Sequence, residues 1–560
     1  MYLNVVYLSE NCYGVGCGAE IYFGKSLSDL TLAECASLAS IVKSPNKYNP
    51  YKNTDNNVER RNLVLKEMLN QEKISYIEYQ NAINTPIIIN ENIENDNKSG
   101  IYSWFTETLI NDVSKDLAKK NKISLESARN LILNGGYKIY STLDPEIQSE
   151  VEKVYYEYQK YLLPENGKYF QSSCVVIDPY TSDILAIVGG LGEKNGNMIF
   201  NRATDAKRPP GSILKPLSVY GPAIEENLIT YATVLDDTPI EINNNSPWPK
   251  NSPNRYRGLV PIYYAVEHSI NTISVKVLDI LGINNSIKFL NKFMISTTEK
   301  DKNSSSLALG QLTNGESLLN LTNAYSAFCN NGKLSRPKTY LYVTDNKGKV
   351  ILNNEQEQKQ VISRETANIM TKMLENVVEN GTASIINLNN ENISVAGKTG
   401  TSSNNEDRWF IGYTPDYLCG IWCGYDMPKP IYTSKNPSCV LFNEIFNNIY
   451  SDTDEKSEFS ISENIIEKEF CFDSGKIQTN GCNNDVRGNR AITGYFKKGT
   501  EPYFECDLHK EVIIDTLDGL EANIFTPIYR KRKIYLVDYL RKNNVTTVDS
   551  NYTIESRKRK

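Results

Sequence analysis

Residues 208–216, Arg-Pro-Pro-Gly-Ser-Ile-Leu-Lys-Pro, contain the point at which a helix begins. Proline lacks an N–H and clashes with the turn before it, so Pro216 fits only the first turn of a helix. The sequence therefore predicts a helix that starts almost at Ser212. Lys215 comes three residues later and lies on the same helix face, with its Cβ about 5 to 6 Å from that of Ser212.

This spacing suits a serine nucleophile and an amine that accepts its proton. A serine hydroxyl is a poor nucleophile until a base removes its proton, and the positive end of a helix favours charge developing on the oxygen. The S-x-x-K pattern alone is common, and its bland interpretation is a capping Ser212 beside a solvated Lys215.

Two further segments favour the catalytic interpretation. Residues 269–271, Ser-Ile-Asn, form an S-x-N motif, and residues 398–400, Lys-Thr-Gly, form a K-T-G motif. The ordered set S-x-x-K, S-x-N and K-T-G is the signature of penicillin-binding proteins and class A β-lactamases. The chain resembles these enzymes in the motifs that carry their acyl-transfer chemistry.

The beginning of the chain carries a second resemblance. Five short segments look like the closing part of the peptidoglycan glycosyltransferase domain of class A, or bifunctional, penicillin-binding proteins. They are Tyr2-Leu3-Asn4, Tyr13-Gly14-Val15, Tyr22-Phe23-Gly24-Lys25, Leu32-Ala33-Glu34 and Tyr48-Asn49-Pro50. The E-D-x-x-F-x-x-H segment that holds that domain's catalytic glutamate does not occur here. We therefore expect an N-terminally truncated member, without glycosyltransferase activity and without the family's membrane anchor.

The resemblance implies a role for each motif residue. Ser212 attacks the peptide carbonyl, Lys215 accepts its proton, and Ser269 passes a proton to the leaving amine. Asn271 holds Lys215 and the substrate amide, while the positive charge of Lys398 lowers the pKa of Lys215. Lys398, Thr399 and Thr401 bind the terminal carboxylate of the substrate. The backbone N–H groups of Ser212 and Thr401 form the oxyanion hole, and Gly400 belongs to the same substrate-binding and oxyanion group.

The family implies a D,D-transpeptidase at the extracytoplasmic face of the membrane or in the cell wall. Its donor is a peptidoglycan stem peptide ending in D-Ala-D-Ala, its acceptor is an amine on a second stem peptide, and β-lactams acylate it. No metal or organic cofactor is expected. A net charge of -6 offers no field for nucleic acid, and we find no signal peptide or run of about 18 apolar residues for membrane insertion.

Three alternatives stay open. Water in place of the amine would make the enzyme a D,D-carboxypeptidase. Glu316, in the pattern Glu-Ser-Leu-Leu-Asn, matches the E-x-x-L-N motif with which class A β-lactamases position a deacylating water, although its helical context favours a place at a helix start. The third alternative is a non-catalytic protein that binds β-lactams or a wall partner.

The patterning predicts an α+β multidomain chain. Helical periodicity covers residues 1–90, the glycosyltransferase remnant, and a polar run at 90–100 opens a linker and pedestal at 91–170. Strand pairs flank the motif helices within 171–450, which indicates an antiparallel sheet covered by helices, as in serine β-lactamases and transpeptidases. Residues 451–560 form a C-terminal extension.

The cysteines do not indicate a metal site. Eleven is an odd number, so at least one is unpaired within the chain. There are two histidines, His268 and His509, and no C-x-x-C pair, so the sequence predicts no zinc site. Cys471, Cys482 and Cys506 cluster near the C-terminus, where a disulfide is compatible with the sequence but its pairing stays open.

Overall fold

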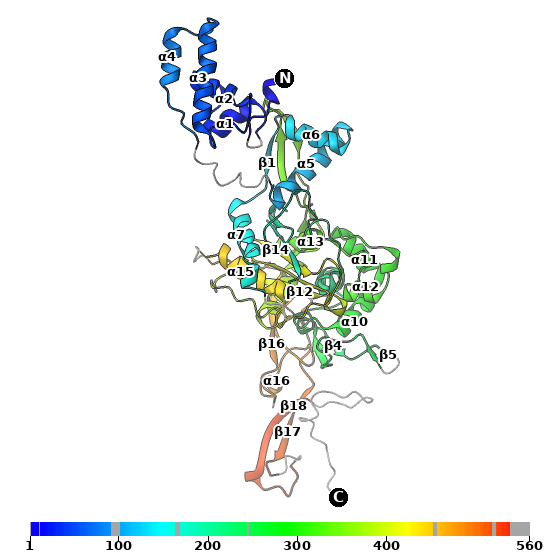
Figure 1. Ribbon diagram of the computed structural model, residues 1–560. Helices are drawn as coiled ribbons and strands as arrows, with labels where there is room; N and C mark the ends of the chain where they lie inside the picture. The colour runs from blue at the N-terminus through cyan, green and yellow to red at the C-terminus, as the bar shows by residue number, and fades with distance from the viewer. Residues whose placement is uncertain are drawn as a thin grey trace.

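The computed structural model is elongated, with N-terminal helices at one end and a C-terminal hairpin at the other (Figure 1). It describes residues 2–9, 12–90, 101–162, 169–243, 246–451, 456–485, 487–517 and 522–537. Most of the predicted linker at 90–100 lies outside these residues. No helix among them is long and apolar enough to cross a membrane.

The described residues among the first ninety are mainly helical, as the periodicity predicts. Their helices are α1 (Val15–Phe23), α2 (Leu32–Ile41), α3 (Thr54–Asn70) and α4 (Tyr76–Asn84), with 3-10 turns at Tyr2–Asn4 and Leu27–Asp29. Thr31 and Glu34 form a reciprocal capping box at the start of α2, which satisfies backbone donors that the first turn leaves free. These helices bury two small apolar clusters of their own.

A second group of elements joins this part to the main sheet. It comprises α5 (Trp104–Asn121), α6 (Leu125–Asn134), β1 (Lys138–Ser141) and α7 (Pro145–Tyr156), followed by a 3-10 turn at Tyr158–Lys160. Asp144 caps α7 through the N–H groups of residues 146 and 147, with Pro145 at the first helical position. Strand β1 pairs antiparallel with β9 (Tyr340–Thr344), which also pairs with β10 (Val350–Asn353).

A five-stranded antiparallel sheet forms the centre of the molecule. Its strands, in spatial order, are β12 (Ala396–Thr401), β13 (Asp407–Tyr413), β14 (Leu418–Gly424), β2 (Gln171–Ile177) and β3 (Ile184–Val188). Every neighbouring pair is antiparallel, and the strand pairs predicted to flank the motif helices are the hairpins β2–β3 and β13–β14. The predicted fold class is confirmed, and the K-T-G motif lies within β12 at the edge of the sheet.

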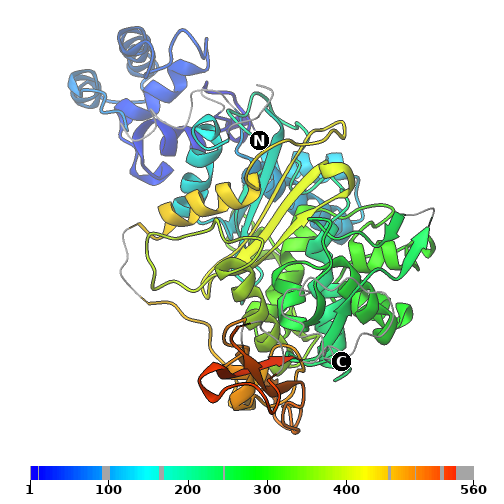
Figure 2. The same ribbon diagram turned by 90° about the horizontal axis from the view of Figure 1, so that it is seen from below.

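Helices cover both faces of this sheet. A Cβ at Gly420 would meet Leu318 and Thr322 of α13 (Leu318–Cys329), whereas one at Gly412 would meet Phe442 of α15 (Pro437–Ile449). Gly412 lies opposite Cys419 in the β13–β14 ladder, so these two residues point to the same face of the sheet. Gly420 is the next residue of β14 and points to the other face, because successive residues of a strand alternate between faces. Helices α13 and α15 therefore pack on opposite sides, and Figure 2 shows α15 against the sheet.

The remaining helices bury much of the rest of the large core. They are α8 (Gly221–Glu225), α9 (Ile262–Glu267), α10 (Asn271–Leu281), α11 (Ile283–Lys292), α12 (Ser304–Leu309) and α14 (Arg364–Glu379), with a 3-10 turn at Glu299–Asp301. Three small two-stranded sheets lie among them. They pair β4 (Val234–Asp237) with β7 (Gly258–Pro261), β5 (Glu241–Asn243) with β6 (Ser246–Trp248), and β8 (Lys333–Leu334) with β11 (Lys359–Gln360).

The described residues of the C-terminal extension form two hairpins, and a short helix lies within the connection of the first one. Strand β15 (Ile465–Cys471) pairs with β16 (Ala491–Lys497), and α16 (Asn480–Asn483) lies between them in the chain. Strand β17 (His509–Asp515) pairs with β18 (Lys531–Val537), after a 3-10 turn at Ile528–Arg530. Phe470 and Phe496 of the first hairpin join the large core, so this hairpin is packed onto the central part of the molecule.

Candidate active site

Ser212 lies in the first turn of a helical segment, as Pro216 predicts. The segment changes type along its length, from a 3-10 turn at Gly211–Leu214 through a π turn at Pro216–Tyr220 to α8. Since Pro216 cannot donate a backbone hydrogen bond, a regular α-helical ladder cannot run through it. Single π turns within helices occur frequently at functional sites, whereas 3-10 turns are frequent at helix ends.

Gly211 brings this turn against the edge strand of the sheet. Its φ is +57°, a region that residues with a Cβ rarely adopt. A Cβ here would lie 2.5 Å from the carbonyl oxygen of Thr401, and the N–H of Gly211 donates to the carbonyl of Gly310 at 3.0 Å. The glycine therefore allows the backbone beside Ser212 to approach β12 closely.

The S-x-N motif lies between α9 and α10. Ser269 was expected on a helix, but it occupies the connection with a φ of 55°, and Asn271 is the first residue of α10. The left-handed turn at Ser269 reverses the chain, so that its carbonyl and its hydroxyl both face Lys215. The sequence prediction failed here because the motif says nothing about backbone conformation.

The Lys215 amine joins the first two motifs. Its Nζ donates to the carbonyl of Ser269 at 2.8 Å and to Oδ1 of Asn271 at 2.7 Å, and it lies 3.4 Å from Oγ of Ser269. The Asn271 amide is held in turn, because its Nδ2 donates to the carbonyl of Lys250 at 2.7 Å. This contact orients Oδ1 towards the lysine.

Both motif lysines are completely buried. Lys215 and Lys398 have side chains with no exposed surface. Burial, and secondly the nearby charge of Lys398, hold the pKa of Lys215 well below its usual range. Burial lowers the pKa of Lys398 to about 7. Burial is thus the larger cause of the lowered pKa of Lys215, and the charge of Lys398 is the smaller one.

Strand β12 presents hydroxyl groups to the cavity and keeps its lysine beneath. Thr399 Oγ1 is hydrogen-bonded to Thr382 Oγ1 at 2.6 Å, and Thr401 Oγ1 accepts from Nη1 of Arg408 at 3.1 Å. Lys398 Nζ donates to the carbonyl of Thr399 at 3.3 Å and does not line the cavity. The contact of Lys398 with the substrate carboxylate, which the resemblance implies, stays a prediction.

The motif residues meet around one cavity of about 380 Å³. Its walls include Ser212, Ser269, Asn271, Thr399 and Thr401. The structure thus brings side chains from all three motifs to the same hollow, with Lys215 hydrogen-bonded to two of its lining residues. An extended peptide could lie along β12, because an edge strand has unpaired backbone groups.

Thr382 and Arg408 are among the lining residues that the sequence analysis does not single out. Thr382 follows α14 and lines the cavity. Arg408 lies directly opposite Thr401 in the β12–β13 ladder, so the side chains of Arg408 and Thr401 point to the same face of the sheet. Arg408 belongs to no motif. Its position could have been found by pairing the two predicted strands across the short 3-10 turn at Ser403–Asn405.

Glu316 lies at a helix start, where its sequence context placed it. It is buried, just before the N-cap Ser317 of α13, and its carboxylate accepts from the Ser317 N–H at 2.8 Å and from Asn320 Nδ2 at 3.1 Å. It is not among the residues that line the cavity.

A second group of reactive side chains lies far from the motifs in the chain. Cys471, Cys482, Cys506 and His509 come together in the C-terminal extension, with their potential ligand atoms all within 4.8 Å of one another. All eleven cysteines have free thiols. The sequence argument against a zinc site considered C-x-x-C pairs and did not anticipate this group.

The chain matches three protein families along its length. Residues 172–421 match the penicillin binding protein transpeptidase domain, residues 1–69 match the transglycosylase family, and residues 461–511 match the C-terminal domain of penicillin-binding protein 1A. The transpeptidase match contains all three motifs. The transglycosylase match agrees with the resemblance of the first helices.

Two curated relatives and one solved structure show the extent of the similarity. Penicillin-binding protein 1A of Clostridium botulinum (strain Hall) is 34% identical over 94% of this chain, which spans 66% of that protein, slightly under two thirds. A crystal structure of penicillin-binding protein 1A from Haemophilus influenzae has a TM-score of 0.64 at 22% identity, covering 90% of this chain and 91% of that one. This structure supports the fold. The second relative, penicillin-binding protein 1A of Clostridium novyi (strain NT), is 32% identical over all of this chain and 68% of that protein. Together with the three family matches, this similarity shows that the chain belongs to the class A penicillin-binding proteins.

Proposed function

We propose that this chain is a serine D,D-transpeptidase that cross-links peptidoglycan stem peptides through an acyl-enzyme on Ser212. The observation that carries the proposal is the fixed Lys215 amine, held by Ser269 and Asn271 beside a cavity that Ser212 lines. The donor is a stem peptide ending in D-Ala-D-Ala, and the acceptor is an amine on a second stem peptide. Chemistry of this type uses no metal or organic cofactor.

The contacts of Lys215 suit a neutral amine. A neutral amine has two N–H groups and one lone pair. Its two short contacts go to the Ser269 carbonyl and to Asn271 Oδ1, and both of these oxygens can only accept. The lone pair is then free to accept a hydroxyl proton, and burial together with Lys398 lowers the pKa of Lys215, which favours this neutral form.

The first half of the reaction forms an ester. Ser212 Oγ attacks the carbonyl carbon of the D-Ala–D-Ala bond while Lys215 takes the hydroxyl proton. Backbone N–H groups of Ser212 and Thr401 stabilise the oxyanion. As the C–N bond breaks, Ser269 passes a proton from Lys215 to the leaving nitrogen, so that free D-Ala departs and Lys215 is neutral again.

The second half transfers the acyl group. The acceptor amine attacks the ester carbon, its surplus proton passes to Lys215, and the C–O bond to Ser212 breaks as Oγ regains a proton. A new peptide bond joins the two stem peptides. A β-lactam follows the first half, but its amide nitrogen remains tethered to the acyl group, so the ester persists and the enzyme is inhibited.

The products of a donor and an acceptor test this proposal. The full chain is incubated with a D-Ala-D-Ala stem peptide and an amine acceptor, and the products are separated by mass. We expect D-Ala release together with a cross-linked peptide. Release of D-Ala with only hydrolysed donor would indicate a carboxypeptidase, and no release would indicate a protein that only binds β-lactams.

Rapid hydrolysis of β-lactams is disfavoured by the position of Glu316. A deacylating water needs a base that reaches the acyl carbonyl, and the Glu316 carboxylate is engaged at the start of α13, away from the cavity lining. Glu316, the residue that motivated the serine β-lactamase alternative, is therefore not placed to activate a deacylating water.

Arg408 is proposed to attract the carboxylate of the donor or of a β-lactam. It lines the cavity beside Thr401, with Nη1 bonded to the threonine hydroxyl. A hydrogen bond to a charged group contributes about 1.5 to 3 kcal/mol. Arg408→Gln is therefore expected to lower the second-order rate of penicillin acylation about 10- to 100-fold, measured by stopped-flow or quenched labelling.

The control for this prediction is Arg364→Gln, which removes an exposed arginine at the start of α14. A penicillin whose carboxylate is esterified should react with the wild type and with Arg408→Gln at similar rates. An undiminished acylation rate of Arg408→Gln with the free acid would contradict the role assigned to Arg408.

The proposed domain boundaries follow the sequence analysis. Residues 1–90 are proposed as the glycosyltransferase segment, 91–170 as the pedestal, 171–450 as the transpeptidase domain and 451–560 as the extension. We also propose that the chain acts at the extracytoplasmic face of the membrane or in the cell wall, where its substrate lies. The expected absence of glycosyltransferase activity stays a prediction.

A further inference from the structure

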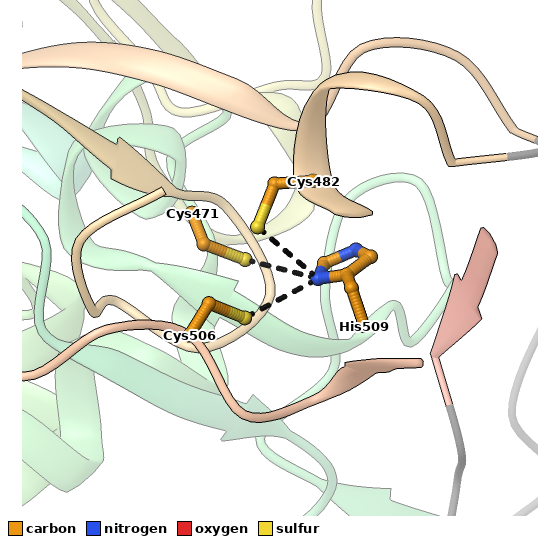
Figure 3. A group of neighbouring side chains, drawn as sticks. All are labelled: Cys471, Cys482, Cys506 and His509. Carbon is orange, nitrogen blue, oxygen red and sulfur yellow. Dashed lines mark hydrogen bonds between the residues drawn. The ribbon is translucent and has the colours of Figure 1, made fainter. Parts of the chain in front are cut away.

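The C-terminal extension contains a buried group of three cysteines and one histidine, which Figure 3 shows pointing toward a common centre. Cys471 ends β15, Cys482 lies in α16, Cys506 lies in the loop before β17, and His509 begins β17. We propose that these four side chains bind one structural zinc ion, through three thiolates and Nδ1 of His509.

The distances match a tetrahedral zinc site. Nδ1 of His509 lies 3.5, 3.4 and 3.3 Å from the Sγ atoms of Cys471, Cys482 and Cys506. With Zn–S bonds of about 2.3 Å and a Zn–N bond of about 2.0 to 2.1 Å, tetrahedral angles place the nitrogen about 3.5 Å from each sulfur. The histidine nitrogen therefore already lies at the distance from each sulfur that a central zinc requires, and all four ligand atoms lie within 4.8 Å of one another.

Hydrogen bonding alone does not account for this arrangement. A neutral imidazole nitrogen has either one proton or one lone pair, so Nδ1 cannot form three hydrogen bonds at once. Three sulfurs nevertheless converge on this single atom. A cation bound to three thiolates and one imidazole satisfies all four groups together.

The other side of the imidazole is supported as in known zinc sites. Nε2 of His509 lies 3.3 Å from Oδ2 of Asp473 and 3.2 Å from Oδ2 of Asp485. Metal-bound histidines usually direct their second ring nitrogen to a carboxylate, which fixes the tautomer and the ring orientation. Arg487 binds both carboxylates and Arg490 binds Asp473, so these acids are held in place.

The surroundings indicate a structural role. The His509 ring and the thiols of Cys471 and Cys482 are buried, and the three cysteines form a small core of their own, packed by Leu508. We call residues 471–485 and 506–509 the cysteine lobe. A lobe with so few apolar residues needs another source of stability, which a zinc ion with four protein ligands provides. The ion would tie the end of β15 to α16 and to the start of β17.

The cysteine lobe also contacts the neighbourhood of the active site. Phe472, the residue after Cys471, packs edge-to-face on Tyr263 and Tyr264 of α9, and Tyr264 packs on His268. His268 lines the cavity next to Ser269. The cysteine lobe thus packs against α9, the helix that leads into the S-x-N motif. A bound zinc ion would keep Phe472 in position for this contact.

Metal content of the full chain tests the proposal. The chain is purified in the presence of reductant and of a mild chelator, and its metals are measured by plasma mass spectrometry. We expect about one zinc per chain. Cells grown with cobalt should yield a chain with the visible d–d bands of tetrahedral Co²⁺ and thiolate-to-cobalt charge transfer. A metal-free chain, or iron in place of zinc, would overturn the proposal.

Variants locate the ion without depending on activity. Cys482→Ser and His509→Ala should lose zinc, and Asp473→Asn should weaken its binding about 10- to 100-fold. Asp507→Asn, which changes an exposed residue between two ligands, and Cys35→Ser, which removes an exposed thiol in α2, should keep it. If the ligand variants do not fold, the wild-type metal content and cobalt spectrum still decide.

A disulfide is the competing state of these cysteines. Peptide mapping of the freshly purified chain, alkylated without prior reduction, distinguishes the two states. We expect all three thiols to be alkylated once the zinc has been removed by acid or chelator. A disulfide between any two of Cys471, Cys482 and Cys506, in a chain without zinc, would contradict the proposal.

Discussion

Replacing Ser212 with alanine is expected to abolish covalent labelling of the chain by a fluorescent penicillin. The substitution removes the only atom that this account allows to form the acyl ester, and it leaves the small first turn of the helix otherwise intact. Labelling is measured on a denaturing gel, where only covalent adducts survive. We expect a strong band for the wild type and none for Ser212→Ala.

The matched control is Ser252→Ala, which removes an exposed hydroxyl that lines the same cavity. This variant should label as the wild type does. Comparable labelling of Ser212→Ala and the wild type would mean that another residue is the nucleophile, and the assignment of the S-x-x-K motif would be wrong.

Replacing Lys215 with methionine is expected to slow penicillin acylation by about 10²- to 10⁴-fold, the range found for the loss of a general base. Methionine fills much of the same buried space but has no lone pair that could take the proton of Ser212. The rate is measured from the time course of labelling. Thermal unfolding of both proteins shows whether the slower rate reflects chemistry or loss of the fold.

The pH dependence of acylation gives this variant a second readout. Only the neutral form of Lys215 accepts a proton, so the wild-type rate should rise with pH as Lys215 loses its charge. Since burial and Lys398 lower the pKa of Lys215, the rise should occur well below the ordinary range of a lysine. The rise should be absent in Lys215→Met, and an unchanged profile in the variant would contradict the role of Lys215.

The fold could be predicted because the central sheet has short apolar strands with clear turns. The strands at 174–178 and 184–188 are visible as apolar runs separated by a turn, and the start of the helix at Ser212 follows from Pro216 alone. The identity of the site depended on three motifs in the right order, which local patterns could not have provided.

The parts of the site that sequence reasoning missed are set by tertiary contacts. The left-handed turn at Ser269 and the burial of Lys398 beneath β12 depend on how the helices and the edge strand pack. The partnership of Arg408 with Thr401 depends on strand register. The turn at Ser269 and the burial of Lys398 have no local sequence signal, whereas the place of Arg408 could have been found by pairing the two strands.

The group around His509 was missed for a similar reason. Its ligands are separated by stretches of very different length, and only Cys506 and His509 are close in the chain. Zinc sites are recognised in sequences by paired ligands at short spacings. Here the fold of the extension brings the ends of two strands and a short helix together, so the group appears only in three dimensions.

The most direct test of the central claim is to locate the adduct that penicillin forms on the wild-type chain. The labelled chain is digested, and the modified peptide is sequenced by tandem mass spectrometry. This account predicts one penicilloyl group, on the side chain of Ser212. A stable adduct on Ser269 or any other residue, or no adduct on a folded chain, would contradict it.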